Sequence, residues 1–156
     1  MRLKICHLIL LFCLTSTSIP AWAAEGSEVR GAWRPELYEM KDGTQHDVTG
    51  LIMFAETDWS VLFFIMDKGE PTRGSGEGGT YSLVGDTLTF RHLYNFSAGN
   101  TISGVPGPPS NLTMTSRNSD APDVPSEPCT IDITGNTLTI NFPSGNMMKF
   151  VRSSAP

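Results

Sequence analysis

The feature that most constrains the fold is a hairpin pattern that occurs twice, fifty positions apart. Residues 81–90 read Tyr-Ser-Leu-Val-Gly-Asp-Thr-Leu-Thr-Phe, and residues 131–140 read Ile-Asp-Ile-Thr-Gly-Asn-Thr-Leu-Thr-Ile. In both, apolar and polar residues alternate on either side of a glycine that supplies a positive-φ turn. No stretch of the chain keeps a helical period. The pattern therefore predicts an antiparallel, all-β protein.

About eight segments have the length and composition of strands, and several are joined by turns of only a few residues. Antiparallel strands connected in chain order favour closure into an up-and-down barrel, because closure removes exposed edges. A two-sheet sandwich is the alternative architecture. An eight-stranded barrel is either filled by side chains or holds one small ligand. The expected strands are 31–40, 49–57, 59–66, 80–84, 87–96, 129–134, 137–142 and 147–152, with a short one at 112–115.

Two of these strands carry unusual faces. Residues 59–66 are apolar on both sides, so this strand is either covered twice or presents apolar surface to a ligand or partner. In residues 87–96, alternation places Phe90, His92 and Tyr94 on one large aromatic face, typical of a core or a cavity lining. The glycine-rich segment 67–79 between the two strands is predicted to be a loop, either a lid beside the barrel mouth or a plain surface loop.

Residues 1–23 have the pattern of a cleavable signal peptide. Arg2 and Lys4 precede a short apolar run, and Ala21-Trp22-Ala23 matches the small-residue cleavage site. The apolar run is shorter than a membrane span requires, and nothing after residue 24 approaches one. We therefore expect residues 24–156 to form one periplasmic or secreted domain.

Cleavage changes the charge and the cysteine content of the chain. Without Arg2 and Lys4, nine basic residues remain against 16 acidic ones, and the net charge moves from −5 to −7. The basic residues are scattered, which argues against nucleic acid and against docking on anionic lipid. Cys129 alone remains of three cysteines, so no internal disulfide is possible and the core must provide the stability.

No catalytic or metal-binding motif is present. The chain lacks Gly-x-Ser-x-Gly and His-Glu-x-x-His, and residues 75–79 lack the lysine of a phosphate loop. No catalytic residue, metal or cofactor is therefore expected. Seven residues are candidates for lining a barrel interior, and the alternative is that they fill the core or, for the arginine, meet solvent: Trp59, Phe63, Arg73, Phe90, His92, Tyr94 and Cys129.

Several short motifs, in this order, resemble a known family over about residues 30–152. Gly31-Ala-Trp33 resembles the Gly-x-Trp start of lipocalins and their relatives. The Asp42-Gly43 turn and the strand from Gly50 resemble the opening of bacterial lipocalin-like domain proteins, and residues 78–89 resemble their Gly-x-Tyr…Gly-Asp-x-Leu-Thr hairpin. The resemblance implies a calycin-like barrel without an established reaction. It also implies that Arg152 packs over Trp33, as the family arginine does.

Three functional hypotheses follow. The first is an exported lipocalin-like barrel that binds a small, largely apolar molecule in its interior. The second is an extracytoplasmic interaction or inhibitor module, which requires a filled barrel and an apolar outer patch. The third is an enzyme that uses His92 and Tyr94 in one cavity. The sequence indicates no ligand identity and no oligomeric state.

Overall fold

The computed structural model describes residues 28–102 and 112–154. The predicted signal peptide lies outside these residues. The described chain forms nine strands: β1 (Gly31–Glu39), β2 (Gln45–Phe54), β3 (Asp58–Asp67), β4 (Glu70–Val84), β5 (Thr87–Gly99), β6 (Thr113–Ser116), β7 (Ser126–Thr134), β8 (Thr137–Asn141) and β9 (Met147–Arg152). Among these residues, no helix is long and apolar enough to cross a membrane.

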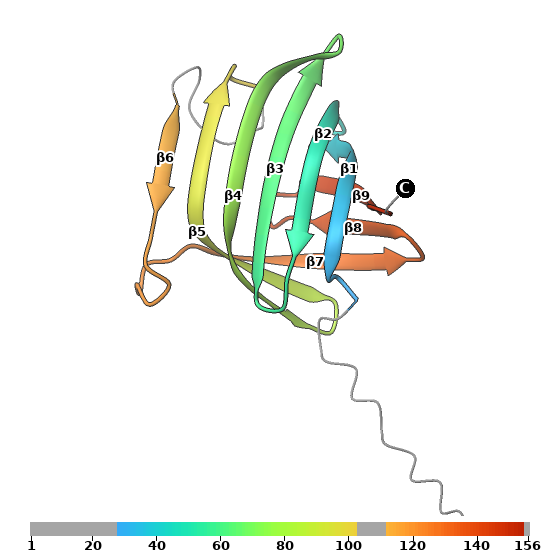
Figure 1. Ribbon diagram of the computed structural model, residues 1–156. Helices are drawn as coiled ribbons and strands as arrows, with labels where there is room; N and C mark the ends of the chain where they lie inside the picture. The colour runs from blue at the N-terminus through green and yellow to red at the C-terminus, as the bar shows by residue number, and fades with distance from the viewer. Residues whose placement is uncertain (1–27, 103–111, 155–156) are drawn as a thin grey trace, which may run out of the picture.

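Eight of the strands close into an antiparallel barrel, so the predicted fold class is confirmed. Hydrogen-bonded neighbours follow the ring β1-β2-β3-β4-β5-β7-β8-β9, and β9 pairs back to β1. The strand β5 has two partners on one edge: β7 along its first half and β6 along its second half. In Figure 1, β6 stands beside the upper part of β5, while β7 runs across the lower part. The barrel wall therefore divides at the middle of β5.

The two hairpins predicted from the repeated pattern are present. Val84 pairs with Thr87 around Gly85-Asp86, and Thr134 pairs with Thr137 around Gly135-Asn136. The glycine of each turn has a positive φ, 60° in the first and 61° in the second. A two-residue turn with a positive φ only at its first residue is one of the preferred hairpin types, because its twist matches that of the strands.

The prediction of a loop over residues 67–79 is wrong. Only the turn at Lys68 and Gly69 separates β3 from β4, and β4 then continues as a 15-residue strand. Strand pairing on both edges overrides the low strand propensity of its glycines. These glycines make room for neighbouring rings, since a side chain at Gly76 would occupy the position of the Phe96 ring. The segment is barrel wall and cannot serve as a lid.

The predicted face of β5 is correct only as far as His92. The pairing between β4 and β5 shifts there: Gly79 pairs with His92 and Gly78 pairs with Tyr94, which leaves Leu93 as the extra residue of a β-bulge. An extra residue reverses the alternation that follows. Tyr94 is consequently 55% exposed on the outside of the barrel and does not share the inner face with His92.

One end of the barrel, formed around Val29, Trp33 and Arg152, is closed. Trp33 is fully buried, and its indole N–H donates to the Val29 carbonyl oxygen at 2.7 Å. The Arg152 guanidinium lies 4.0 Å from the centre of the Trp33 ring. It also donates to the backbone carbonyls of Arg30 and Glu28, both at 2.8 Å. The packing of Arg152 over Trp33 that the resemblance implied is therefore present.

Candidate functional site

A cavity of about 350 Å³ occupies the half of the barrel away from the closed end. Its wall includes the second half of β5, one residue of β6 and the turn between β8 and β9, so it lies where the barrel wall divides. A volume of this size lies at the lower end of the range for small-molecule sites. The lining residues are Tyr38, Ile52, Trp59, Val61, Phe63, Arg73, Ser75, Glu77, Phe90, His92, Asn95, Ser97, Thr113, Glu127, Ile140, Phe142, Ser144, Asn146, Met148 and Phe150.

The size of the inward side chains explains why this half is hollow. Towards the closed end, β4 and β5 contribute the buried Leu83, Leu88 and Phe90. Beyond the bulge, the same two strands turn Ser75 and Ser97 inward, and these side chains are too short to fill the centre. The strands on the opposite side of the cavity contribute bulky apolar side chains to its wall. The cavity therefore has a polar wall on β4 and β5 and an apolar wall across from it.

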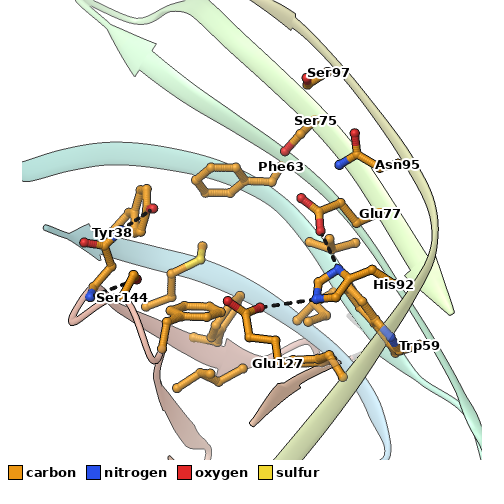
Figure 2. Close-up of a pocket in the computed structure, with 18 of the residues that line it drawn as sticks. Tyr38, Trp59, Phe63, Ser75, Glu77, His92, Asn95, Ser97, Glu127 and Ser144 are labelled. Atoms are coloured by element: carbon orange, nitrogen blue, oxygen red, sulfur yellow. Dashed lines mark hydrogen bonds and ion pairs between the residues drawn. The ribbon is translucent and has the colours of Figure 1, made fainter. Parts of the chain in front are cut away.

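The polar wall contains an imidazole held between two carboxylates. His92 Nδ1 lies 3.0 Å from Glu77 Oε2, and His92 Nε2 lies 3.3 Å from Glu127 Oε2. Figure 2 shows the two glutamates reaching His92 from different strands, with Trp59 beneath the imidazole. The side chains of His92, Glu77 and Glu127 are 19%, 29% and 34% exposed. This cluster, which we call the carboxylate–histidine cluster, borders the cavity.

The surroundings of His92 favour its protonated form. Burial by itself lowers the pKa of a histidine, because a charged ring loses solvation. Hydrogen bonds to Glu127 and Glu77, together with the charges of these carboxylates, outweigh burial and raise the pKa of His92 from 6.5 to about 9. At neutral pH the cluster therefore contains one cation between two anions.

The divided wall positions Glu127. Arg91 pairs with Ser126 at the start of β7, and the His92 amide donates to the Pro125 carbonyl oxygen at 3.0 Å. Two residues further along β5, the partner is already β6. Glu127 is thus the first inward residue of β7, opposite Phe90 and near the bulge in β5. His92 lies just before the bulge and keeps the inward face of β5, which brings the two side chains together.

Across the cavity, a second polar group is anchored in the turn between β8 and β9. Asn146 is 6% exposed, and its side-chain amide donates to the Tyr38 hydroxyl at 3.0 Å. Its side-chain oxygen accepts from the Lys41 amide at 3.1 Å. Burial raises the pKa of Tyr38, so its hydroxyl stays protonated. These bonds fix the tyrosine ring as part of the cavity wall.

Solved structures provide the comparison for this fold. A lipocalin-like protein from Bacteroides uniformis ATCC 8492 matches with a TM-score of 0.49 at 15% identity, over 81% of this chain and 99% of the other. A de novo designed fluorescence-activating β-barrel also matches, with a TM-score of 0.37 at 11% identity, over 80% of this chain and 93% of the other. No protein-family model and no curated protein sequence match the chain.

Five of the seven predicted site residues lie on the cavity wall of the barrel: Trp59, Phe63, Arg73, Phe90 and His92. Arg73 is only 5% exposed and donates to the Asn100 carbonyl oxygen at 3.1 Å, so it is not a solvated arginine. That any of these residues contacts a ligand stays a prediction.

The other two predicted residues do not line the cavity. Tyr94 faces outward because of the bulge at Leu93. Cys129 is 1% exposed and belongs to the core next to Glu127 along β7. Burial raises the pKa of its thiol to about 12, and the charge of the nearby Glu127 is a second, smaller cause. The thiol therefore stays protonated and has little nucleophilic character.

Sequence reasoning missed both carboxylates of the cluster. Glu77 lies in the glycine-rich segment that was predicted to be a loop, and Glu127 lies two residues before the start of the strand expected at 129–134. Two-residue alternation from Arg73 through Ser75 to Glu77 is the signal that identifies an inward-facing glutamate, once β4 is recognised as a strand.

Metal chemistry receives no geometric support from the described residues. Within them, no group of three histidine, cysteine or acidic side chains is arranged to hold a metal ion. Both nitrogens of His92 face carboxylate oxygens, whereas a metal ligand must direct one nitrogen at the metal. The enzyme hypothesis also loses its residue pair, because Tyr94 and His92 lie on opposite faces of β5.

Proposed function

We propose that this lipocalin-like barrel binds a small, largely apolar molecule that carries one polar group. The observation that supports this most is the cavity itself, which combines an extensive apolar wall with a few polar groups at one side. Sites for small molecules have this composition, since apolar surface gives affinity and a few polar groups fix orientation.

The apolar wall provides the larger contact surface. Phe63 packs edge-on against Tyr38 with ring centres 5.5 Å apart, and Trp59 packs against Phe90 at 4.4 Å. These mutual contacts hold the rings in place before any ligand arrives. A preorganised aromatic wall loses little side-chain entropy on binding, which favours affinity.

We further propose that the barrel acts outside the cytoplasm, in the periplasm or as a secreted protein. The support for this is the signal-peptide pattern of residues 1–23. A barrel without an internal disulfide depends on its packed core and not on an oxidising compartment, so export and the fold are compatible.

Binding of the neutral dye Nile red tests this proposal. We expect its fluorescence to rise with protein concentration and to saturate. The substitution Ser75→Phe places a ring inside the cavity and should abolish the signal, whereas Ser82→Phe, on the exposed face of the same strand, should leave it unchanged. Circular dichroism checks that both variants keep the fold. Equal binding by the folded Ser75→Phe and Ser82→Phe variants contradicts a ligand site in the cavity.

A second candidate is an interaction module that works through the outer surface. The filled barrel expected for it is absent, because the interior holds a cavity. The other expected feature is present, since a row of apolar side chains lies on the outer surface. Leu62 pairs with Gly76, Gly76 with Phe96, and Phe96 with Met114, so the row crosses β3 to β6. Leu62 and Phe96 are each 45% exposed, and Met114 is 75% exposed. Adjacent exposed apolar groups of this kind mark contact surfaces. Loss of a co-purifying protein from a Phe96→Ser variant that keeps Nile red binding would support this function.

A further inference from the structure

We propose that the cavity selects ligands with a protonated primary amine, which the carboxylates of Glu77 and Glu127 bind while the apolar wall holds the rest of the molecule. This inference rests on the proposed ligand binding and adds the chemical class of the ligand.

The cluster leaves carboxylate oxygens available as acceptors. Each glutamate contacts His92 through its Oε2 atom. Among the described residues, the Oε1 atoms of Glu77 and Glu127 have no hydrogen-bond partner. In Figure 2, the second oxygen of each carboxylate points away from His92. A primary ammonium group has three N–H donors and no acceptor, so it can donate to a free carboxylate oxygen of the cluster.

The charges at this wall do not balance. Two carboxylates and one imidazolium leave one negative charge beside the apolar wall. An ammonium group neutralises it, and hydrogen bonds between charged groups are stronger than those between neutral ones. A carboxylate ligand would add a third anion to the same place, and like charges at short range are unfavourable in a partly desolvated site.

The cavity wall contains two cations, Arg73 and His92. Arg73 precedes Glu77 by four residues on β4, which corresponds to about 13 Å along the strand. Its guanidinium donates to the Asn100 carbonyl oxygen at the end of β5. The His92 ring contacts both carboxylates. The cation of the cluster itself is therefore His92.

Aromatic side chains lie on the cavity wall together with the carboxylates. Figure 2 shows Phe63 and Tyr38 on the cavity side of Glu77, and Trp59 beneath His92. An amine attached to an aromatic or alkyl body places that body against these rings. Aromatic faces also attract cations, which adds to the attraction of the carboxylates. The class of ligand that fits is an aryl-alkyl or alkyl primary amine.

Isothermal titration calorimetry with three ligands that share one apolar body tests the inference. The ligands are 1-naphthylmethylamine, 1-naphthalenemethanol and 1-naphthoic acid, at pH 7. We expect the amine to bind about tenfold more tightly than the alcohol, and the acid to bind most weakly. Binding of the amine no tighter than the alcohol overturns the assignment but leaves ligand binding intact. If the protein binds neither Nile red nor any of the three ligands, the proposed function is overturned as well.

Two variants connect the amine preference to the cluster. Glu127→Gln and Glu77→Gln each remove one charge and leave His92 one carboxylate partner. In either variant we expect the affinity for the amine to fall about tenfold, and the amine-to-alcohol affinity ratio to fall with it. Glu70→Gln is the matched control, because Glu70 is exposed on the same strand and does not line the cavity. An unchanged amine preference in both folded cluster variants overturns the inference.

Discussion

At the scale of single residues, the chemistry of the cavity depends on His92 and the two carboxylates around it. Since the pKa of His92 is about 9 in the folded chain and near 6.5 in an unfolded one, the folded state holds the proton more tightly. The stabilisation that results is complete below pH 6.5, decreases as the pH rises, and is lost above about pH 9.

The pH dependence of unfolding measures this contribution. In urea titrations, the free energy of unfolding of the wild-type chain should fall by roughly 2–3 kcal/mol more than that of a His92→Gln variant between pH 6 and pH 9.5. Other titrating groups are common to both proteins and cancel in the difference. Parallel pH profiles for the two proteins, or an NMR titration of His92 with a midpoint near 6.5, contradict the proposed cluster.

At the scale of secondary structure elements, the bulge in β5 decides which residues face the cavity. It depends on Gly79, because a side chain at this position would overlap the Arg91 carbonyl and lie 2.9 Å from the Leu93 amide. The neighbouring backbone cannot move aside without breaking the pairing between β4 and β5. Glycine in the middle of a strand thus marks a close approach of two backbones.

Replacement of Gly79 tests this dependence. Gly79→Ala should lower the free energy of unfolding by about 2 kcal/mol or more, because the overlap is with backbone atoms. Gly74→Ala is the control, since its added methyl meets only the Phe64 ring, which can rotate; its effect should stay within about 1 kcal/mol. Chemical denaturation measures both. Similar effects of the two substitutions would show that the bulge does not need glycine.

The same elements show how far the sequence predicts the site. Period-two alternation correctly predicts strands such as β7 and β8, where one face is buried and the other is polar. It fails at Tyr94, because a bulge is set by pairing with another strand and leaves no mark in β5 itself. It also fails over residues 70–79, where glycine indicates a loop but the long pairing with β3 and β5 imposes a strand. For these reasons, the sequence does not predict Glu77 and Glu127 as cavity residues.

At the scale of the whole molecule, the barrel has one end filled and one end hollow. At the filled end, Trp33 and Arg152 pack as the resemblance of Gly31-Ala-Trp33 implied. The hollow end results from Ser75 and Ser97 on strands whose earlier residues are large. The position of the hollow end depends on pairing between strands that are distant in the sequence, so the sequence alone does not predict it.

The filled end should account for a measurable part of the stability. Arg152→Met removes two hydrogen bonds to backbone carbonyls and the contact with the Trp33 ring, and we expect a loss of about 2–3 kcal/mol in the free energy of unfolding. Arg34→Met, at an exposed position of β1, should change it by less than about 0.5 kcal/mol. Thermal and urea unfolding provide the comparison. Equal losses in the two variants would mean that Arg152 does not secure this end.

The central claim is that the hollow end of the barrel is a site for a small molecule. Native mass spectrometry of the protein purified from its own cells tests it most directly. We expect a retained adduct of small-molecule mass in the wild-type protein and its loss in the Ser75→Phe variant. A wild-type spectrum with the mass of the bare chain alone, from protein that also fails to bind Nile red, would contradict it.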